Sequence, residues 1–297
     1  MTTKNNSNVV FPPEIFIIGA PKCGTTSLAK LLETHPEITL SDPKETDYLT
    51  RNYPKGIHWY QSRFAVSDET RFLIDASTSY SAFTEQQIGS NTAKRLFEFN
   101  PAAKIIYVVR DPIQRAWSSY WHSVRAGEEK RDFIEVMAIE NCFHIIAGKF
   151  YACLVNYQKY FDKKNICIIS FTELVKDPDK ATMKVLEFIG ADTKQYRKPK
   201  SDNQHKNISF QWNSSAGWLI KIFGVRRIKK IIQLTKRIVP VFLFEALKKI
   251  VSKPIPKIKH EDACSLLSFY EDDAENFYTE TGVDVRTGAW WDAGKRD

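Results

Sequence analysis

A glycine- and hydroxyl-rich turn, "FIIGAPKCGTTSL" at residues 16–28, carries the clearest chemistry in the sequence. Gly19 and Gly24 allow the backbone to turn tightly, and the amides from Cys23 to Ser27 can point at an anion at the start of a helix. A Walker loop runs G-x-x-x-x-G-K-S/T, but here Lys22 precedes the second glycine instead of following it. The hydroxyl donors that can join these amides are Thr25, Thr26 and Ser27.

This turn predicts a site for a single 5'-phosphate. No lysine follows the second glycine, and no apolar strand ends in a convincing Walker B aspartate, so little is present to hold magnesium and a β,γ-phosphate pair. From the crest of the loop, Lys22 can reach the oxygen that bridges the phosphate to the transferred group. An ordinary glycine-containing turn between a strand and a helix is the alternative for this stretch alone.

A second strand-turn-helix, "YVVRDPIQRAWSSYWHSVRAGEE" at residues 107–129, suggests another phosphate site. Arg110 ends the strand, Pro112 favours the helix start, and Ser118 follows eight residues after Arg110. A guanidinium and a hydroxyl together suit a phosphate. The alternative is that Arg110 pairs with a carboxylate, either Asp111 or Glu128.

The two motifs together resemble the sulfotransferases that use 3'-phosphoadenosine 5'-phosphosulfate. "PKCGTTSL" is similar to their 5'-phosphosulfate loop and "RDPIQRAWSSY" to their 3'-phosphate motif. "FTELVKDPDKATMKVLEFIG" and the closing "TGVDVRTGAWW" also resemble this family, so the similarity covers nearly the whole chain. Within the family, the closest resemblance is to bacterial-type and carbohydrate or heparan-type enzymes with a glutamate base.

The resemblance implies transfer of a sulfuryl group to an acceptor hydroxyl, leaving adenosine 3',5'-bisphosphate, with no metal required. Such a transfer needs a base, and "DPKETDYL" is similar to the K-E-x-H-F-F segment of the carbohydrate enzymes, with Lys44 and Glu45 at the matching positions. Glu45 is therefore the expected base, and Asp47 stands where the family has histidine. A solvated loop carboxylate is the alternative for Glu45.

The acceptor side is expected to include "LIDASTSYSAF" at residues 73–83, which resembles a family segment that lines the acceptor cleft. Ser77 and Tyr80 match that segment, whereas Ala76 replaces its frequent lysine. This missing cation argues against a heavily sulfated acceptor. The implied acceptor is a hydroxyl-bearing small molecule or glycan, most simply a carbohydrate or glycoconjugate.

Further nucleotide contacts are expected from two segments similar to the family. Tyr151 in "GKFYACLVNYQKYF" matches a tyrosine near the nucleotide, with a core aromatic as the alternative. Lys206 and Asn207 in "HKNISFQ" fall where relatives place a loop over the 3'-phosphate and adenine. His122, like the other histidines, is interpreted as a surface or hydrogen-bonded side chain.

The elements that must position these residues alternate between strands and helices. Apolar runs predict strands at 14–18, 37–40, 71–75, 104–109 and 166–170. Helices are expected at 25–34, 84–99, 113–126, 132–146, 149–161, 179–189 and 261–281. This order predicts an α/β, P-loop-like, three-layer fold around a mostly parallel sheet. The expected organisation is one domain, 1–297, with a nucleotide-binding core at 14–197 and a mainly helical part at 198–297 that shapes the acceptor cleft.

Basic residues concentrate in one segment. Residues 218–259 hold 12 of the 43 Lys and Arg and one of the 35 acids. This placement favours a local anionic or membrane-facing surface over general nucleic-acid binding. Peripheral membrane contact through 218–250 stays open beside the simpler interpretation of a helix that packs its isoleucines and solvates its lysines.

Composition is that of a globular protein of 297 residues with 43% hydrophobic residues. The five scattered cysteines, with no C-x-x-C, and the polar "MTTKNNSNVVFPPE" lead us to expect a cytoplasmic protein without a transmembrane helix. Two other functions remain open: a P-loop nucleotide-dependent kinase, and a non-catalytic binding protein that uses the basic 218–259 segment.

Overall fold

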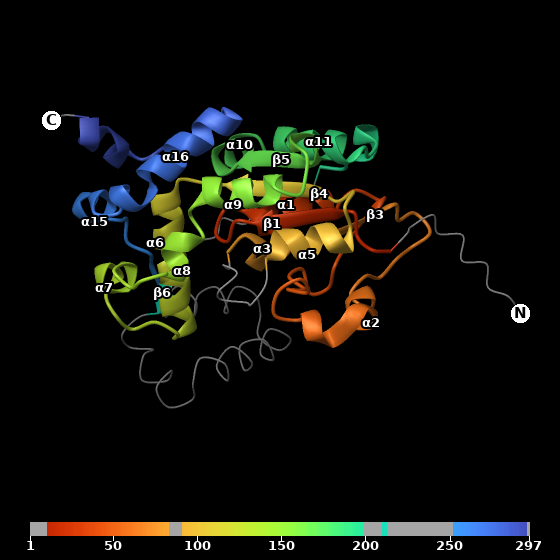
Figure 1. Cartoon of the computed structure of the whole chain (residues 1–297), viewed down its shortest axis with the longest axis horizontal. Coiled ribbons are helices and arrows are strands. Elements are labelled where there is room, and N and C mark those ends of the chain that lie inside the picture. The colour runs from red at the N-terminus through yellow and green to blue at the C-terminus, as the bar shows by residue number, and fades with distance from the viewer. Residues whose placement is uncertain (1–10, 83–90, 199–209, 213–251, 296–297) are drawn as a thin grey trace, which may run out of the picture.

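A parallel sheet of five strands in the order β2-β3-β1-β4-β5 forms the centre of the molecule (Figure 1). The computed structural model describes residues 11–82, 91–198, 210–212 and 252–295. The strands are β1 (Ile15–Gly19), β2 (Ile38–Leu40), β3 (Phe72–Asp75), β4 (Lys104–Val109) and β5 (Ile166–Ser170). All five strands expected from the sequence are present, and the predicted parallel sheet is confirmed.

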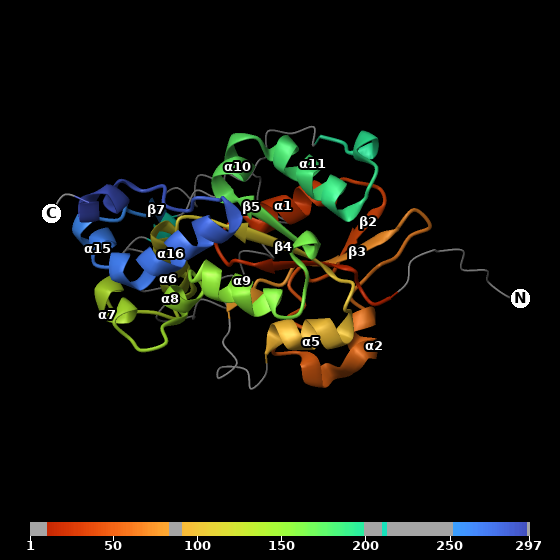
Figure 2. The same ribbon diagram turned by 45° about the horizontal axis from the view of Figure 1, so that its top comes forward.

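Helices cover both faces of this sheet, as the turned view in Figure 2 shows. One face carries α1 (Thr25–Leu32), α10 (Phe171–Lys176) and α11 (Pro178–Ile189). The other carries α3 (Ser79–Ala82), α5 (Thr92–Phe99) and α9 (Phe150–Gln158). Every side chain of β1 is buried, because a strand between two helical layers has no solvent face. The predicted three-layer architecture is confirmed.

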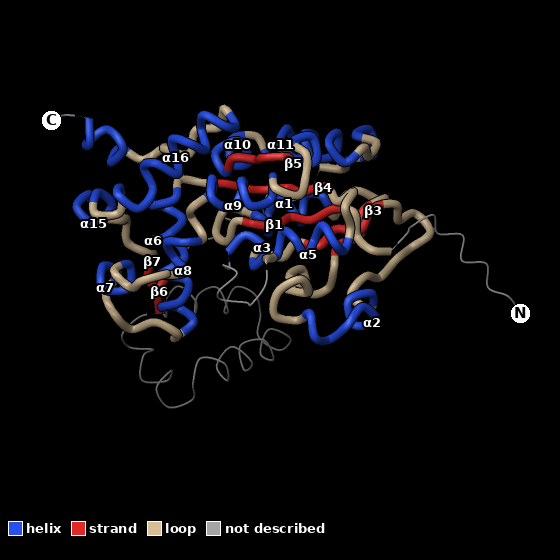
Figure 3. Tube along the Cα trace, viewed as in Figure 1, coloured by secondary structure: helices blue, strands red, loops and turns tan. Residues whose placement is uncertain are grey.

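A second apolar cluster lies beyond one end of the sheet, around α6 (Pro112–Ala126). Ile113 and Tyr120 of α6 pack there against Phe133, Leu266 and Tyr270. The cluster also draws on α7 (Phe133–Met137), α8 (Phe143–Ile146), α15 (His260–Cys264) and α16 (Leu267–Thr281). Figure 3 shows them as a group of helices beside the strands.

The remaining elements are short. They are α2 (Gly56–Gln61), the antiparallel pair β6 (Phe210–Trp212) and β7 (Ser252–Pro254), and four 3-10 turns at Tyr53–Lys55, Lys163–Asn165, Thr193–Gln195 and Ala289–Lys295. None of the helices in the described ranges is long and apolar enough to span a membrane. Most of the basic segment 218–259 lies outside the described residues, and the division at residue 197 stays a prediction.

The helix predicted over 132–146 is wrong as a single element. It breaks into α7 and α8 because Asn141 has a φ of 55°, a left-handed conformation that cannot continue a right-handed helix. The helix predicted from residue 84 is described only from Thr92, where the side chain of Asn91 caps it by accepting from the amide of Lys94 at 3.1 Å. The helix expected at 261–281 is likewise divided, into α15 and α16.

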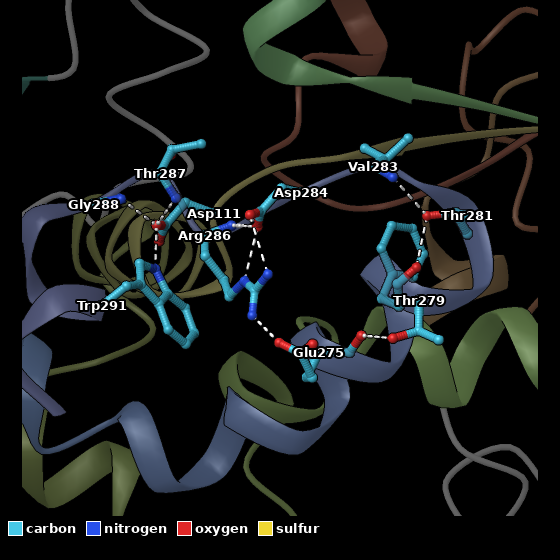
Figure 4. Close-up of polar contacts among 11 residues, drawn as sticks. Asp111, Glu275, Thr279, Thr281, Val283, Asp284, Arg286, Thr287, Gly288 and Trp291 are labelled. Atoms are coloured by element: carbon cyan, nitrogen blue, oxygen red, sulfur yellow. Dashed lines mark hydrogen bonds and ion pairs between the residues drawn. The ribbon is translucent and has the colours of Figure 1, made fainter. Parts of the chain in front are cut away.

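The closing "TGVDVRTGAWW" segment is tied to the start of α6 by one buried carboxylate (Figure 4). Oδ2 of Asp111 accepts hydrogen bonds from the amides of Thr287 (3.2 Å) and Gly288 (3.0 Å) and from the indole of Trp291 (2.9 Å). Oδ1 of Asp111 accepts from the amide of Gln114 at 2.9 Å and caps α6. The C-terminal segment is therefore joined to the turn between β4 and α6.

Asp111→Asn is expected to destabilise the protein by about 1–3 kcal/mol, because an amide NH2 must face donors on at least one side of the group. Urea or thermal unfolding measures this loss. Asp272→Asn, an exposed position on α16, is the matched control and should leave stability unchanged. Equal stability of the two variants would contradict the assigned role of Asp111.

Candidate active site

The carboxyl edge of the sheet brings the predicted motifs together. The phosphate loop follows β1, Arg110 follows β4, and the segments that contain Glu45 and Ser77 follow β2 and β3. Because the strands are parallel, all four ends lie at one edge. The chain crosses from one side of β1 to the other between β3 and β4, which makes this edge a topological switch point where α/β proteins bind ligands.

The phosphate loop leaves backbone donors available at the start of α1. In the described part of the chain, the amides of Gly24, Thr25 and Thr26 make no backbone hydrogen bond, whereas the amide of Ser27 donates to the carbonyl of Gly24 at 2.9 Å. Gly24 has a φ of 92°, and a Cβ there would lie 3.0 Å from the ring of Phe171. Only glycine fits this turn, which presents helix amides to an anion.

The side chains of the loop differ in exposure. Thr25 is buried, Ser27 is half-buried and Thr26 is exposed. Cys23 is fully buried, and burial raises the pKa of its thiol to about 12. Cys23 therefore stays a neutral thiol, and any contribution to phosphate binding comes from its amide.

Lys22 lies among other cations. Its pKa is lowered to about 8, first by burial and then by Arg125, Arg110 and Arg115, while the charge of Glu45 acts in the opposite direction. Its Nζ lies 3.3 Å from Nδ1 of His122. Because the charged form of Lys22 is disfavoured here, an anion bound beside it would stabilise the ammonium electrostatically.

Sequence reasoning missed His122 and Arg125 as neighbours of Lys22. Both project from α6 on the side that carries Ser118, at helical spacings of four and seven residues from it. That periodicity was the signal that could have found them. The interpretation of His122 as a hydrogen-bonded side chain is confirmed, but its partner is the lysine of the phosphate loop.

Arg110 connects the two predicted phosphate sites. One Nη donates to the side chain of Gln114 at 3.1 Å, the other to the carbonyl of Lys22 at 3.4 Å, and the guanidinium stacks on Phe171. Within the described residues, Arg110 forms no ion pair and its buried Nε has no partner. The alternative of a pair with Asp111 is not realised, because the carboxylate of Asp111 is used by the C-terminal segment.

Two residues of α6, Ser118 and Arg115, carry polar groups without a partner among the described residues. Ser118 is half-buried, and its hydroxyl has no hydrogen-bond partner in the described ranges. Arg115 is fully buried and donates to the carbonyl of His144, while its Nε and one Nη have no partner in the part of the chain described. Burial lowers the pKa of Arg110 and of Arg125, and the charge of Arg115 adds to the lowering at Arg110.

Glu45 is exposed but held in place. Its Oε1 lies 3.0 Å from Nζ of Lys44, and its Oε2 accepts from the hydroxyl of Thr78 at 2.9 Å. Lys44 is fixed in turn, because Nζ also donates to the carbonyl of Ala76 at 3.0 Å. These contacts favour a positioned carboxylate over a freely solvated one, and the role of Glu45 as base stays a prediction.

A buried carboxylate, Asp75, organises the segment around Glu45. It accepts hydrogen bonds from four hydroxyls, at 2.6 Å from Ser77 and 2.7 Å from each of Thr46, Tyr60 and Tyr80. Burial raises the pKa of Asp75, although the four hydrogen bonds oppose that shift. Because Thr46 adjoins Glu45 in the chain, the cluster fixes the backbone that carries the expected base.

This cluster corrects the expectation that Ser77 and Tyr80 line the acceptor cleft. They are 0% and 2% exposed, and their hydroxyls support Asp75 while accepting from the amides of Asp47 (3.0 Å) and Leu49 (3.2 Å). Both side chains are too deeply buried to offer a surface to an acceptor. Asp47 has a φ of 50°, and its carboxylate accepts from Ser79 at 2.6 Å, so a direct acceptor contact by Asp47 stays a prediction.

The remaining expected nucleotide contacts are those of Tyr151, Lys206 and Asn207. Tyr151 is half-buried against the main core, as its alternative interpretation proposed, and its contact with the nucleotide stays a prediction. Its amide donates to Asp273 at 3.0 Å. Lys206 and Asn207 lie outside the described residues. Among the residues described, no group of three or more His, Cys, Asp or Glu side chains could hold a metal ion.

Comparison with known proteins identifies the family to which this geometry corresponds. A family model described as "Sulfotransferase domain" matches residues 12–220. The chain is 31% identical over 150 residues to the membrane-associated sulfotransferase kil1 of Dictyostelium discoideum, a match that covers 50% of this chain and 31% of that protein. It is 24% identical over 281 residues to heparan sulfate glucosamine 3-O-sulfotransferase 6 of Mus musculus, covering 92% and 72%.

A third relative is the human bifunctional heparan sulfate N-deacetylase/N-sulfotransferase 3, 30% identical over 202 residues that make up 60% of this chain and 22% of that protein. The chain thus spans less than a third of the length of kil1 and of this bifunctional enzyme. Among solved structures, a sulfotransferase from Alicyclobacillus acidocaldarius shares the fold, with a TM-score of 0.57, 23% identity, and coverage of 80% of this chain and 100% of that one.

The lowered pKa of Lys22 predicts that binding of adenosine 3',5'-bisphosphate weakens as pH rises. Affinity should fall by about tenfold or more between about pH 7 and about pH 9.5, because the ammonium is lost near pH 8 while the phosphates, with a second pKa of about 6, keep their charge. Titration calorimetry across this range measures the change.

The matched control for this prediction is Lys22→Arg, which keeps its charge throughout the range. Its affinity should be nearly independent of pH, even if weaker. An identical pH dependence in the wild type and in Lys22→Arg would show that another group titrates.

Proposed function

Because the chain belongs to the sulfotransferase domain family, we propose that it transfers a sulfuryl group from 3'-phosphoadenosine 5'-phosphosulfate to an acceptor hydroxyl. One observation carries the proposal. Lys22 and Arg110 form no ion pair in the described residues and adjoin each other through the carbonyl of Lys22, while the charge of the Glu45 carboxylate acts on Lys22. The cations that would bind the leaving phosphate and the carboxylate that would deprotonate the acceptor hydroxyl therefore lie at the same carboxyl edge of the sheet.

The donor is held at two places in this proposal. The amides of Gly24, Thr25 and Thr26, with the hydroxyls of the loop, bind the 5'-phosphate. Arg110, whose buried Nε has no partner within the described chain, binds the 3'-phosphate together with the hydroxyl of Ser118. Lys22 lies between these sites and neutralises the charge that develops on the bridging oxygen when the sulfur-oxygen bond breaks.

The acceptor hydroxyl gives its proton to Glu45 as its oxygen forms the new bond to sulfur. The hydrogen bond from Thr78 and the pair with Lys44 orient this carboxylate, which lowers the cost of placing a base in line with the donor. The Asp75 cluster positions the same segment from behind. The products are the sulfated acceptor and adenosine 3',5'-bisphosphate, and this scheme uses no metal.

We further propose a carbohydrate or glycoconjugate as the acceptor. Support comes from the heparan sulfate glucosamine 3-O-sulfotransferase 6 of Mus musculus, which aligns over 92% of this chain. The five cysteines are free thiols in the structure, which supports a cytoplasmic, reducing location.

Transfer of labelled sulfate from the donor to a panel of glycans tests the activity directly, and absence of transfer to every hydroxyl acceptor would contradict it.

Glu45→Gln should lower kcat by about 10²- to 10⁴-fold, the usual contribution of a positioned general base. Glutamine keeps the shape and the contact with Thr78 but cannot accept the proton. Affinity for adenosine 3',5'-bisphosphate should stay within about twofold of the wild type, since Glu45 lies on the acceptor side. Steady-state kinetics and calorimetry measure the two effects.

Glu98→Gln, an exposed glutamate on α5, is the control and should behave as wild type. Normal turnover by Glu45→Gln would show that another group is the base, and the neighbour of Lys22, His122, would then be tested next.

A further inference from the structure

A groove of about 520 Å³ lies between α1 and β2 and shares only Thr26 with the residues assigned to the donor. Figure 2 shows α1 next to β2, which is an edge strand of the sheet. Its volume falls in the range of about 300–1,000 Å³ found for ligand pockets. Its lining consists of Thr26, Ala29, Lys30, Glu33, Ile38, Thr39, Leu40, Ser41, Asp42, Lys44 and Ala65.

Two lining residues of the groove adjoin the proposed reaction centre. Thr26 belongs to the phosphate loop, and Nζ of Lys44 lies 3.0 Å from Glu45. An acceptor whose hydroxyl reaches Glu45 therefore has its nearest continuation along this groove. A second groove, of about 250 Å³, lies over β5 and is lined by none of the residues assigned to the reaction.

The charges of the groove are balanced. Two cations, Lys30 and Lys44, share it with two anions, Glu33 and Asp42. Glu33 and Asp42 are exposed, so a polyanion entering the groove would meet negative charge as often as positive charge. A heavily sulfated chain would therefore gain little electrostatic binding energy in this groove.

The uncharged part of the lining suits a polyhydroxylated chain. The half-buried Leu40 presents aliphatic surface for the C–H face of a sugar ring, and Ala65 is exposed at the rim. The charged side chains and Thr39 provide hydrogen bonds for hydroxyls. A neutral glycan can use both kinds of surface without leaving a charge unpaired.

We propose that this groove binds the part of the acceptor remote from the sulfated hydroxyl, and that it takes an uncharged, hydroxyl-rich chain such as a neutral oligosaccharide. The inference rests on the proposed sulfotransferase function and names the class of its acceptor. It makes Glu33 and Asp42 determinants of specificity that exclude polyanions.

The first test uses chain length. Sulfate transfer is measured to a neutral monosaccharide glycoside, to the corresponding neutral tetrasaccharide, and to an unsulfated uronic-acid-containing tetrasaccharide. The wild type should prefer the neutral tetrasaccharide to both of the others. Ala65→Trp, which narrows the groove at an exposed position, should raise KM for the neutral tetrasaccharide by about tenfold, leave kcat nearly unchanged and leave the monosaccharide unaffected.

The second test uses charge. Glu33→Lys gives the groove a net positive charge and should shift the kcat/KM ratio toward the uronic-acid tetrasaccharide by about tenfold. Glu98→Lys on α5 makes the same charge change away from the groove and should leave the ratio unchanged. Binding of adenosine 3',5'-bisphosphate should be the same in all variants, which shows that each is folded.

Three results would overturn the inference while leaving the proposed function intact. They are a preference of the wild type for the charged tetrasaccharide, an unchanged KM in Ala65→Trp, and equal ratios in Glu33→Lys and Glu98→Lys. Failure to bind the bisphosphate, together with no transfer to any acceptor, would instead overturn the proposed function itself.

Discussion

Uncompensated positive charge at the carboxyl edge of the sheet is the constraint on which the site depends. Lys22, Arg110, Arg115 and Arg125 are close enough that the arginines help to lower the pKa of the lysine to about 8. Such an arrangement costs free energy in the free protein, because each charge disfavours the others and burial removes water from them. Anionic phosphates bound at this edge relieve that cost, so the same feature that strains the free protein favours its ligand.

Buried carboxylates hold the surrounding segments without forming ion pairs with these cations in the described residues. Asp75 collects the hydroxyls that fix the loop around Glu45, and Asp111 binds the C-terminal segment. Asp273 of α16 accepts from the amides of Tyr151 and Ala152 at 3.0 Å each and so holds the start of α9. Each carboxylate is occupied by amide, hydroxyl or indole donors. The carboxylates therefore hold the segments around the site, and the cations remain available to bind phosphate.

The sequence predicted the frame because its signals are local. Buried parallel strands appear as continuous apolar runs, and the glycines of the phosphate loop are required by backbone conformation at their own positions. The direction of individual side chains was not predictable in the same way. Ser77 and Tyr80 were placed in the cleft by motif, whereas they point inward at a carboxylate whose burial only the folded sheet creates. Asn141 breaks a helix through a left-handed conformation that apolar periodicity does not reveal.

Thermal denaturation with three nucleotides tests the central claim most directly, since binding to the native state raises the midpoint with the logarithm of ligand concentration over Kd. The account predicts a clear rise with adenosine 3',5'-bisphosphate, a smaller one with AMP, which lacks the 3'-phosphate that Arg110 would bind, and none beyond AMP with ATP and magnesium. A rise with ATP and magnesium and none with the bisphosphate would contradict the assignment of both phosphate sites.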